Sequence, residues 1–217
     1  AIDLSDLRRK VYENPKVGDG TAGPARLNIL SSRSSTINFN QLVTYKNKFN
    51  LNSIELLAGH ESNAYSYEYF YSMKTAEIIP GVYEFGNFVN ISEVSSYTDT
   101  YNKEGYFARA NYDYDSKYYA SLSYRHDGSS IFSTENRWGD FWSFGASWRI
   151  SEEQFMKDLS FINNLKLRAS YGETGNDALS SYYPYQTLYL LGMNNGLEAG
   201  AYFTTLANKD LIWETQI

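Results

Sequence analysis

The stretch GYFARANYDY, residues 105–114, decides the fold class of this chain. Its even-numbered positions hold only Tyr and Ala, whereas Arg109, Asn111 and Asp113 occupy odd-numbered positions. Because successive side chains of a β-strand point to opposite faces, this period of two predicts a strand with one apolar and one polar face.

The same alternation continues downstream of this stretch. Segments 118–125, 141–150 and 165–172 place mainly Tyr, Trp, Phe, Leu or Ala on one face and mainly Ser, Gly, Arg or Lys on the other. Less regular segments at 34–46 and 51–71 predict two earlier strands, and a further strand is expected to begin near Leu211. Regular segments of about 8–11 residues suit tilted strands that span a membrane.

The predicted connections differ in length in a regular way. Short turns at 46–50 and 113–117 alternate with longer segments: 74–102 and 173–210 are long, and 126–139 is intermediate in length. The segment 151–164 is expected to hold one helical turn, with Ser151 as its N-cap. Outer-membrane barrels have short periplasmic turns and longer external loops. We therefore expect an all-β fold: an antiparallel up-and-down meander, as a partial, open slice of a transmembrane β-barrel with long external loops.

The composition excludes several classes of function. The 217 residues include no Cys and only two His, which excludes disulfides, thiolate zinc sites and a cysteine nucleophile. The 19 basic and 25 acidic residues argue against a nucleic-acid-binding protein. No apolar run approaches the roughly 18 residues of a membrane-spanning helix. The sequence predicts no catalytic, cofactor-binding or metal site, and it leaves the substrate-binding residues unknown.

A soluble β-sandwich binding module with aromatic-rich loops is the alternative, because sandwich strands also alternate. The apolar faces here mix Ala with Tyr and Trp, whereas a sandwich core prefers Val, Ile and Leu. Aromatic residues also gather near segment ends, as at Trp142 and Trp148, which resembles the two aromatic girdles of a membrane protein. A glycan-degrading enzyme, the third possibility, lacks a convincing carboxylate pair.

Several motifs resemble the SusC/RagA family of TonB-dependent outer-membrane transporters in both order and spacing. They are GYFARANYDY (105–114), RHDGSS (125–130), NRWG (136–139), WRISEE (148–153), LKLRASYGETGN (165–176) and NKDLIWET (208–215). Residues 33–71 match more loosely, mainly at LLAGHE (56–61). His126 and Lys209 depart from the family pattern without disturbing the assignment.

The resemblance implies a barrel of about 22 strands around an N-terminal plug. Residues 1–217 would form one interior slice of that barrel, with no signal peptide, no plug domain and no closing C-terminal strands. The family is not enzymatic; it imports oligosaccharide or peptide ligands across the cell outer membrane of Gram-negative bacteria. The implied partners are outer-membrane lipids, a SusD-like lipoprotein lid and the TonB complex, which would act through the missing plug region.

Four short motifs suggest chemistry but have plainer explanations. Residues 113–117 resemble the start of a calcium loop without the Gly and Glu that an EF-hand needs, so a tight turn is expected. The pairs His126–Asp127 and His60–Glu61 resemble a general base with its carboxylate, yet adjacent strand residues point to opposite faces. Residues 172–177 are Gly-rich but lack the following helix that a phosphate site requires.

Two groups of side chains remain as candidates for contact with a solute or a partner. Cations of the polar face would form cross-strand charge pairs, contact the plug or line a solute path; they are Arg109, Arg125, Arg149, Lys166 and Arg168. Tyrosines of the segment 173–210 would stack on sugar rings, pack against one another or meet a lid; they are Tyr182, Tyr183, Tyr185, Tyr189 and Tyr202.

Overall fold

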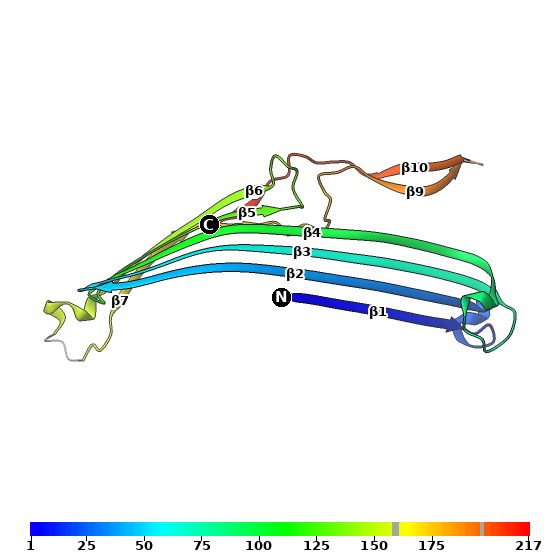
Figure 1. Cartoon of the computed structure of the whole chain (residues 1–217), viewed down its shortest axis with the longest axis horizontal. Helices are drawn as coiled ribbons and strands as arrows, with labels where there is room; N and C mark the ends of the chain where they lie inside the picture. The colour runs from blue at the N-terminus through cyan, green and yellow to red at the C-terminus, as the bar shows by residue number, and fades with distance from the viewer. Residues whose placement is uncertain (158–160, 196–197) are drawn as a thin grey trace. The chain divides into compact units, whose positions relative to one another are not determined.

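The computed structural model describes residues 1–157, 161–195 and 198–217. The main sheet contains seven strands in sequential order, each beside its neighbour in the chain (Figure 1). This confirms the predicted all-β, antiparallel up-and-down meander, and the sheet is open. No helix among the described residues is long and apolar enough to cross a membrane. The strands of this sheet are β1 (Ile2–Glu13), β2 (Arg26–Phe49), β3 (Asn52–Glu77), β4 (Phe88–Tyr114), β5 (Tyr118–Ser129), β6 (Trp138–Arg149) and β7 (Lys166–Gly172).

Two strands, β2 and β4, are much longer than the sequence pattern predicts, and β3 is a few residues longer than its predicted segment 51–71. Strands β2, β3 and β4 contain 24, 26 and 27 residues. The predicted long loop at 74–102 is therefore wrong, because β3 continues to Glu77 and β4 already begins at Phe88. At about 3.3 Å per residue, β4 is roughly 90 Å long, about three times the thickness of the hydrocarbon core of a bilayer.

The first strand has no alternating apolar pattern and was not predicted. Strand β1 pairs with β2 from Ile2 opposite Ile37 to Glu13 opposite Arg26. Both of its faces carry charge, because Asp3 and Arg9 occupy odd positions whereas Asp6 and Arg8 occupy even ones. A period of two cannot be seen where both faces are polar.

The C-terminal segment differs from the predicted seventh strand. Strand β11 (Glu214–Gln216) pairs with β8 (Thr174–Asn176) in a separate two-stranded sheet, so the strand expected near Leu211 does not join the main sheet. The predicted loop 173–210 also contains a hairpin, formed by β9 (Leu188–Asn195) and β10 (Glu198–Thr205). The outermost strands of the main sheet are β1 and β7.

The shorter connections agree in part with the predictions. Asp115 and Ser116 adopt positive φ angles of 53° and 54°, and the Ser116 amide donates to Asp113 Oδ1 over 2.8 Å, which confirms the tight turn at 113–117. The connection at 126–139 is shorter than predicted, since β5 ends at Ser129 and β6 begins at Trp138.

The expected helical turn in 151–164 is a pair of 3-10 turns. They are η3 (Ile150–Glu152) and η4 (Gln154–Met156), and neither has a side-chain cap. The predicted N-cap at Ser151 is therefore wrong: Ser151 lies inside η3, and its hydroxyl is buried without a hydrogen-bond partner. Part of this predicted segment, residues 158–160, lies outside the described residues.

The chain divides into two compact units. The first unit comprises Ala1–Asn38 and Ala64–Thr100, and it also contains η1 (Gly18–Ala22) and η2 (Phe85–Asn87). The second unit comprises Phe39–Asn63 and Tyr101–Ile217.

Each unit has a small core of its own. The core of the first unit consists of Ala25, Leu27 and Phe88. In the second unit, the buried hydrophobic side chains are those of Ile131, Phe132 and Phe141.

The apolar sets of the alternating segments stay outside both cores. Leu122 on β5 and Leu167 on β7 keep 54% and 61% of their surface exposed. A β-sandwich would bury such residues between two facing sheets. The sandwich alternative is therefore wrong. The seven strands form one sequential sheet, and the described core contains no residue from the apolar face of the alternating segments.

Candidate functional site

The register of β4–β7 places the alternating residues on two chemically different faces. Leu122 lies opposite both Ala110 of β4 and Phe144 of β6, and Phe144 lies opposite Tyr171 of β7. On the other face, Ser123 lies opposite Ser143, and the two hydroxyls are 2.6 Å apart. The predicted apolar and polar faces are thus confirmed for these four strands.

Aromatic residues form two rows on the apolar face. In one row, Tyr124 lies opposite Trp142, and Tyr106 lies opposite His126. In the other row, residues opposite one another on three strands are Tyr114, Tyr118 and Trp148. Smaller apolar residues lie between the rows, together with Tyr112 and Tyr171; they are Ala110, Ala120, Leu122, Phe144, Ala146 and Ala169. This arrangement matches the aromatic girdles and apolar band of membrane barrels.

The tyrosine hydroxyls of these rows donate to carboxylates while their rings stay exposed. Tyr124 donates to Asp140 over 2.5 Å, and Tyr118 donates to Glu153 Oε1 over 2.5 Å. The Tyr118 hydroxyl and the Trp148 indole also hold the pKa of Glu153 below its usual value. Such rings present an apolar body with a satisfied polar tip, which suits a boundary between hydrocarbon and water.

In both histidine pairs, the histidine and the following acid point to opposite faces of the sheet, as predicted. His126 stacks on Trp138 with ring centroids 4.7 Å apart, and its Nδ1 lies 2.7 Å from Asp140 Oδ1. Its sequence neighbour Asp127 instead binds Arg125 on the polar face. His126 therefore does not have Asp127 as an orienting carboxylate.

His60 repeats this pattern on β3. Its Nε2 lies 3.1 Å from Glu104 Oε1, and its ring stacks on Tyr106. The neighbouring Glu61 binds Arg125. Neither histidine pair forms the general-base arrangement that its sequence resembles.

Arg125 is the centre of an ion-pair cluster on the polar face. Its guanidinium binds Glu61 and Asp127, with 3.0 Å between Nε and Asp127 Oδ2, and it lies 5.0 Å from the centre of the Phe107 ring. Gly105 allows this close approach, because a Cβ there would lie 2.5 Å from Asp127 Oδ1. The cluster joins β3 to β5 across β4, and thus confirms the predicted cross-strand charge pairing at Arg125.

Two open depressions lie along the polar face of the sheet; the first is lined by residues of β3–β7 and the second by residues of β5–β8. One has a volume of about 570 Å³ and is lined by residues that include Tyr119, Lys166 and Arg168. The other has a volume of about 690 Å³, and its lining includes Arg125 and Asp127. These volumes are within the range of small-molecule sites. The linings contain charged and hydroxyl groups that can bind a solute or another part of a protein.

The five predicted cations of the polar face are not equivalent. Arg125 has two carboxylate partners, and Arg109 lies on β4 opposite Ser123. Arg149, Lys166 and Arg168 lie together on the facing segments of β6 and β7, where Lys166 is opposite Arg149 and Arg168 is opposite Ser147.

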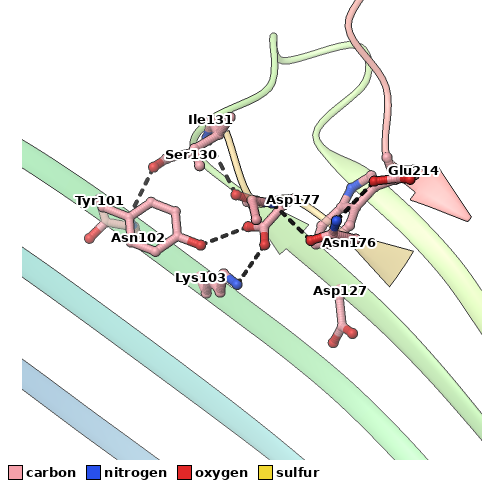
Figure 2. A network of polar contacts seen from close by, with 12 residues as sticks. Tyr101, Asn102, Lys103, Asp127, Ser130, Ile131, Asn176, Asp177 and Glu214 are labelled. Carbon is pink, nitrogen blue, oxygen red and sulfur yellow. Dashed lines mark hydrogen bonds and ion pairs between the residues drawn. The ribbon is translucent and has the colours of Figure 1, made fainter. Parts of the chain in front are cut away.

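Asp177 forms a buried polar cluster that sequence reasoning missed (Figure 2). It is 8% exposed, and it accepts hydrogen bonds from the Tyr101 hydroxyl over 2.6 Å and from Lys103 Nζ over 2.7 Å. Next to it, Asn176 donates to Glu214 Oε2 over 2.9 Å (Figure 2). The cluster fastens the segment after β7 to β4. No local pattern could have revealed it, because 74 positions separate Lys103 from Asp177.

Aromatic packing also fastens the loops of the second unit. Trp213 packs against Phe132 and Phe141 with centroids 5.3 and 5.4 Å apart, and its indole donates to the Arg137 carbonyl. Gly175 lies against the Phe141 ring, where a Cβ would come within 2.0 Å of a ring carbon. Close packing therefore accounts for a glycine in the motif 172–177, which has no helix behind it.

The loop tyrosines divide into two groups. Tyr182 lies 5.6 Å from the ring of Tyr101 and 6.5 Å from that of Tyr183, and the Tyr185 hydroxyl accepts a bond from Gln186. Tyr189 and Tyr202 are exposed on the β9–β10 hairpin. The first group packs locally, whereas the second presents rings to the surroundings.

The acidic turn after β4 uses its carboxylates locally. Lys117 Nζ lies 2.9 Å from Asp115 Oδ2, and Asp113 accepts the Ser116 amide. Among residues 1–157, 161–195 and 198–217, no group of three His, Asp or Glu side chains is placed to hold a metal ion.

A family model described as "TonB dependent receptor-like, beta-barrel" matches residues 5–216. TonB-dependent receptor P3 of Formosa agariphila is 33% identical over 207 residues, which cover 91% of this chain and 20% of that protein. TonB-dependent receptor SusC of Bacteroides thetaiotaomicron is 35% identical over 132 residues, which cover 57% of this chain and 13% of SusC.

The fold also matches a solved structure. The RagAB peptide transporter superposes with a TM-score of 0.87 and 24% identity, over 99% of this chain and 24% of the matched chain. The chain thus spans between about a tenth and a quarter of the length of these relatives. The resemblance to the SusC/RagA transporters is confirmed, and the chain belongs to the TonB-dependent receptor-like β-barrel family.

Proposed function

We propose that this chain forms part of the wall of an outer-membrane barrel that imports nutrients in a TonB-dependent manner. The observation that carries this proposal is the two-faced sheet of β4–β7, whose exposed apolar band lies between two aromatic rows. Soluble monomers rarely expose contiguous apolar patches above a few hundred Å². Lipid is the solvent that suits this face, and water suits the opposite face.

Seven strands form only part of such a barrel. An open sheet edge in hydrocarbon leaves backbone groups unsatisfied at several kcal/mol each, so membrane strands occur in closed barrels. The family relatives are about five to nine times longer than the segment that they share with this chain. We assign residues 1–217 to one section of a larger barrel, with the plug and the remaining strands in other parts of a longer protein.

The substrates of this transporter are oligosaccharide or peptide fragments. The matched structure is that of a peptide transporter, which supports peptide fragments, and the resemblance to the SusC/RagA family implies oligosaccharide fragments as the other class. The function requires no covalent chemistry of the chain. Its partners are a SusD-like lipoprotein lid on the outer side, outer-membrane lipids and the TonB complex, which would act through the plug.

Deletion of the full-length gene tests this function. The deletion strain is expected to lose growth on at least one oligosaccharide or peptide mixture as the sole carbon source, and the full-length gene should restore it. A protonophore should abolish uptake, because TonB-dependent import draws on the proton gradient. Fractionation of the protein with soluble periplasmic proteins, or unchanged growth on all such substrates, would contradict the proposal.

A further inference from the structure

We propose that Arg149, Lys166 and Arg168 form a carboxylate-binding site on the polar face of the sheet. This site goes beyond the proposed function, since transport through a barrel does not by itself require an anion site at this place. The carboxylate comes either from another segment of the longer protein or from a dissolved ligand, and the experiment below separates these two sources.

The register brings the three cations together. Arg149 and Lys166 lie directly opposite each other on β6 and β7, where Cβ atoms are typically about 5 Å apart. Arg168 lies two residues further along β7 and therefore on the same face. Like charges placed directly opposite each other destabilise a sheet. An anion between them would remove this cost.

Tyr119 forms a common platform for two of these cations. Lys166 Nζ lies 3.7 Å from the centre of the Tyr119 ring, and the Arg149 guanidinium lies 5.8 Å from it. Tyr119, Lys166 and Arg168 all line the depression of about 570 Å³. The ring therefore orients Arg149 and Lys166, and Lys166 and Arg168 lie beside an open space that can admit a ligand.

The positive charge at this place is not balanced. Among the described residues, no carboxylate forms an ion pair with Arg149, Lys166 or Arg168. Two acids line the same depression, but Glu55 binds Lys46 over 3.1 Å, and Asp113 Oδ1 accepts the Ser116 amide. Of the two acids that line the depression, Glu55 therefore has a lysine partner and Asp113 has no ion pair among the described residues.

Arg149 also has an unsatisfied donor. Its Nε is buried and has no hydrogen-bond partner. A buried donor that lacks an acceptor costs about 1–3 kcal/mol, and more when the group is charged. Arg125, on the same face, shows the satisfied alternative, because both of its carboxylate partners are in place.

The donor set favours a carboxylate. A guanidinium presents parallel N–H groups that match the two oxygens of a carboxylate, and a lysine adds a point charge. Two guanidinium groups and one ammonium can therefore hold a single carboxylate and neutralise part of the cluster.

Carbodiimide cross-linking of the purified full-length protein tests the intramolecular source. This reagent joins a lysine amine to a carboxylate only when the two are in contact. If the source lies in the same protein, peptide mass spectrometry should find Lys166 joined to an Asp or Glu outside residues 1–217. The linked peptide should be absent from the Lys166→Gln variant and present in Lys48→Gln, whose exposed lysine lies outside the cluster.

Calorimetric titration with glutarate tests the dissolved source. If Lys166 is not joined to such an acid, the wild-type protein should bind glutarate, and Lys166→Gln/Arg168→Gln should bind it about tenfold or more weakly. Lys48→Gln should bind glutarate as the wild type does. Either the cross-link or this binding pattern supports the site. Absence of both, or cross-links of Lys166 to Asp113 and Glu55 alone without glutarate binding, would overturn it.

Discussion

The two units of this chain share strands β2, β3 and β4 but use opposite chemistry on them. In the second unit, one face of the sheet is apolar and exposed, and it holds no ion pair between its aromatic rows. In the first unit, both faces of β1 carry charges, and cross-strand ion pairs such as Arg33–Asp6 and Arg26–Glu13 connect it to β2. Under the proposed function, the apolar face of the second unit meets lipid, whereas both faces of β1 meet water.

The alternation of apolar and polar residues therefore depends on the solvent at each face as well as on the strand itself. A strand between lipid and water must alternate, because each face meets a different medium. A strand with water on both faces has no such requirement, and polar cross-strand pairs and aromatic stacks stabilise it instead. In the first unit, Tyr69 and Tyr97 provide such a stack, with centroids 4.9 Å apart.

The largest loss of stability is expected from a substitution in the core of the first unit. Phe88 is 1% exposed and packs with Ala25 and Leu27. Phe88→Ala in the full-length protein is expected to destabilise this unit by about 3–5 kcal/mol, because it leaves a cavity. Hydrogen exchange of β1 and of the start of β4 measures the loss. Val89→Ala, at an exposed neighbouring position, should leave exchange nearly unchanged; equal effects of both variants would refute this core.

A matched pair of charge insertions probes the two solvents directly. Leu122 in the second unit and Val94 in the first have similar exposed fractions of 54% and 61%, so only the surrounding medium should distinguish them. Leu122→Arg is expected to cost about 2–4 kcal/mol in the membrane. Val94→Arg should change stability by less than about 0.5 kcal/mol. Denaturant unfolding of the full-length protein in lipid vesicles measures both free-energy changes. Similar costs for the two variants would contradict a difference in solvent between these positions.

The Asp177 cluster should control the loops of the second unit rather than the sheet. Asp177→Asn removes the charge that Lys103 and Tyr101 bind, and leaves a cation without its partner. We expect a local cost of about 1–3 kcal/mol. Limited proteolysis should then cut the segment 173–187 faster than in the wild type. Asp210→Asn, at an exposed position, is the control; if both variants are cut at the same rate, the cluster does not hold the loop.

The smallest expected effect concerns an exposed ion pair of the first unit. Lys10 donates to Glu84 over 2.7 Å and holds the pKa of Glu84 below its usual value. A lowered carboxyl pKa stabilises the fold above the usual value, and this contribution is lost as the pH falls through the lowered pKa. Glu84→Gln should therefore slightly reduce the exchange protection of residues 78–87 at pH 7 and leave it unchanged near pH 3. A larger loss of exchange protection at pH 3 than at pH 7 would contradict a stabilising contribution from the Lys10–Glu84 ion pair.

The sequence predicts the strands of the second unit well for a physical reason. Residues 106–114, 118–125, 141–150 and 165–172 alternate, as is expected where lipid meets one face of a strand and water the other. Strand β1 and the first half of β4 could not be found in this way, since no apolar face repeats there. The length of a transmembrane β-strand is thus underestimated when only its apolar part is recognised.

The sequence also predicts only part of the candidate site. Arg125, Lys166 and Arg168 could be placed on the polar face from alternation alone. The sequence could not predict which of them forms ion pairs. Glu61, which binds Arg125, lies 64 positions away in the chain, and no described carboxylate pairs with Lys166 or Arg168. Asp177 was hidden for a similar reason, since its partners lie on a distant part of β4.

Spin labels along β6 test the central claim, that lipid covers one face of this sheet and water the other. Single cysteines at Phe144, Ala146, Ser143 and Ser147 would be introduced into a cysteine-free, full-length protein in bilayers, and each nitroxide exposed to oxygen and to a water-soluble nickel complex. We predict that labels at Phe144 and Ala146 collide mainly with oxygen, and labels at Ser143 and Ser147 mainly with nickel. The same ratio at all four positions, or the reversed alternation, would contradict the account.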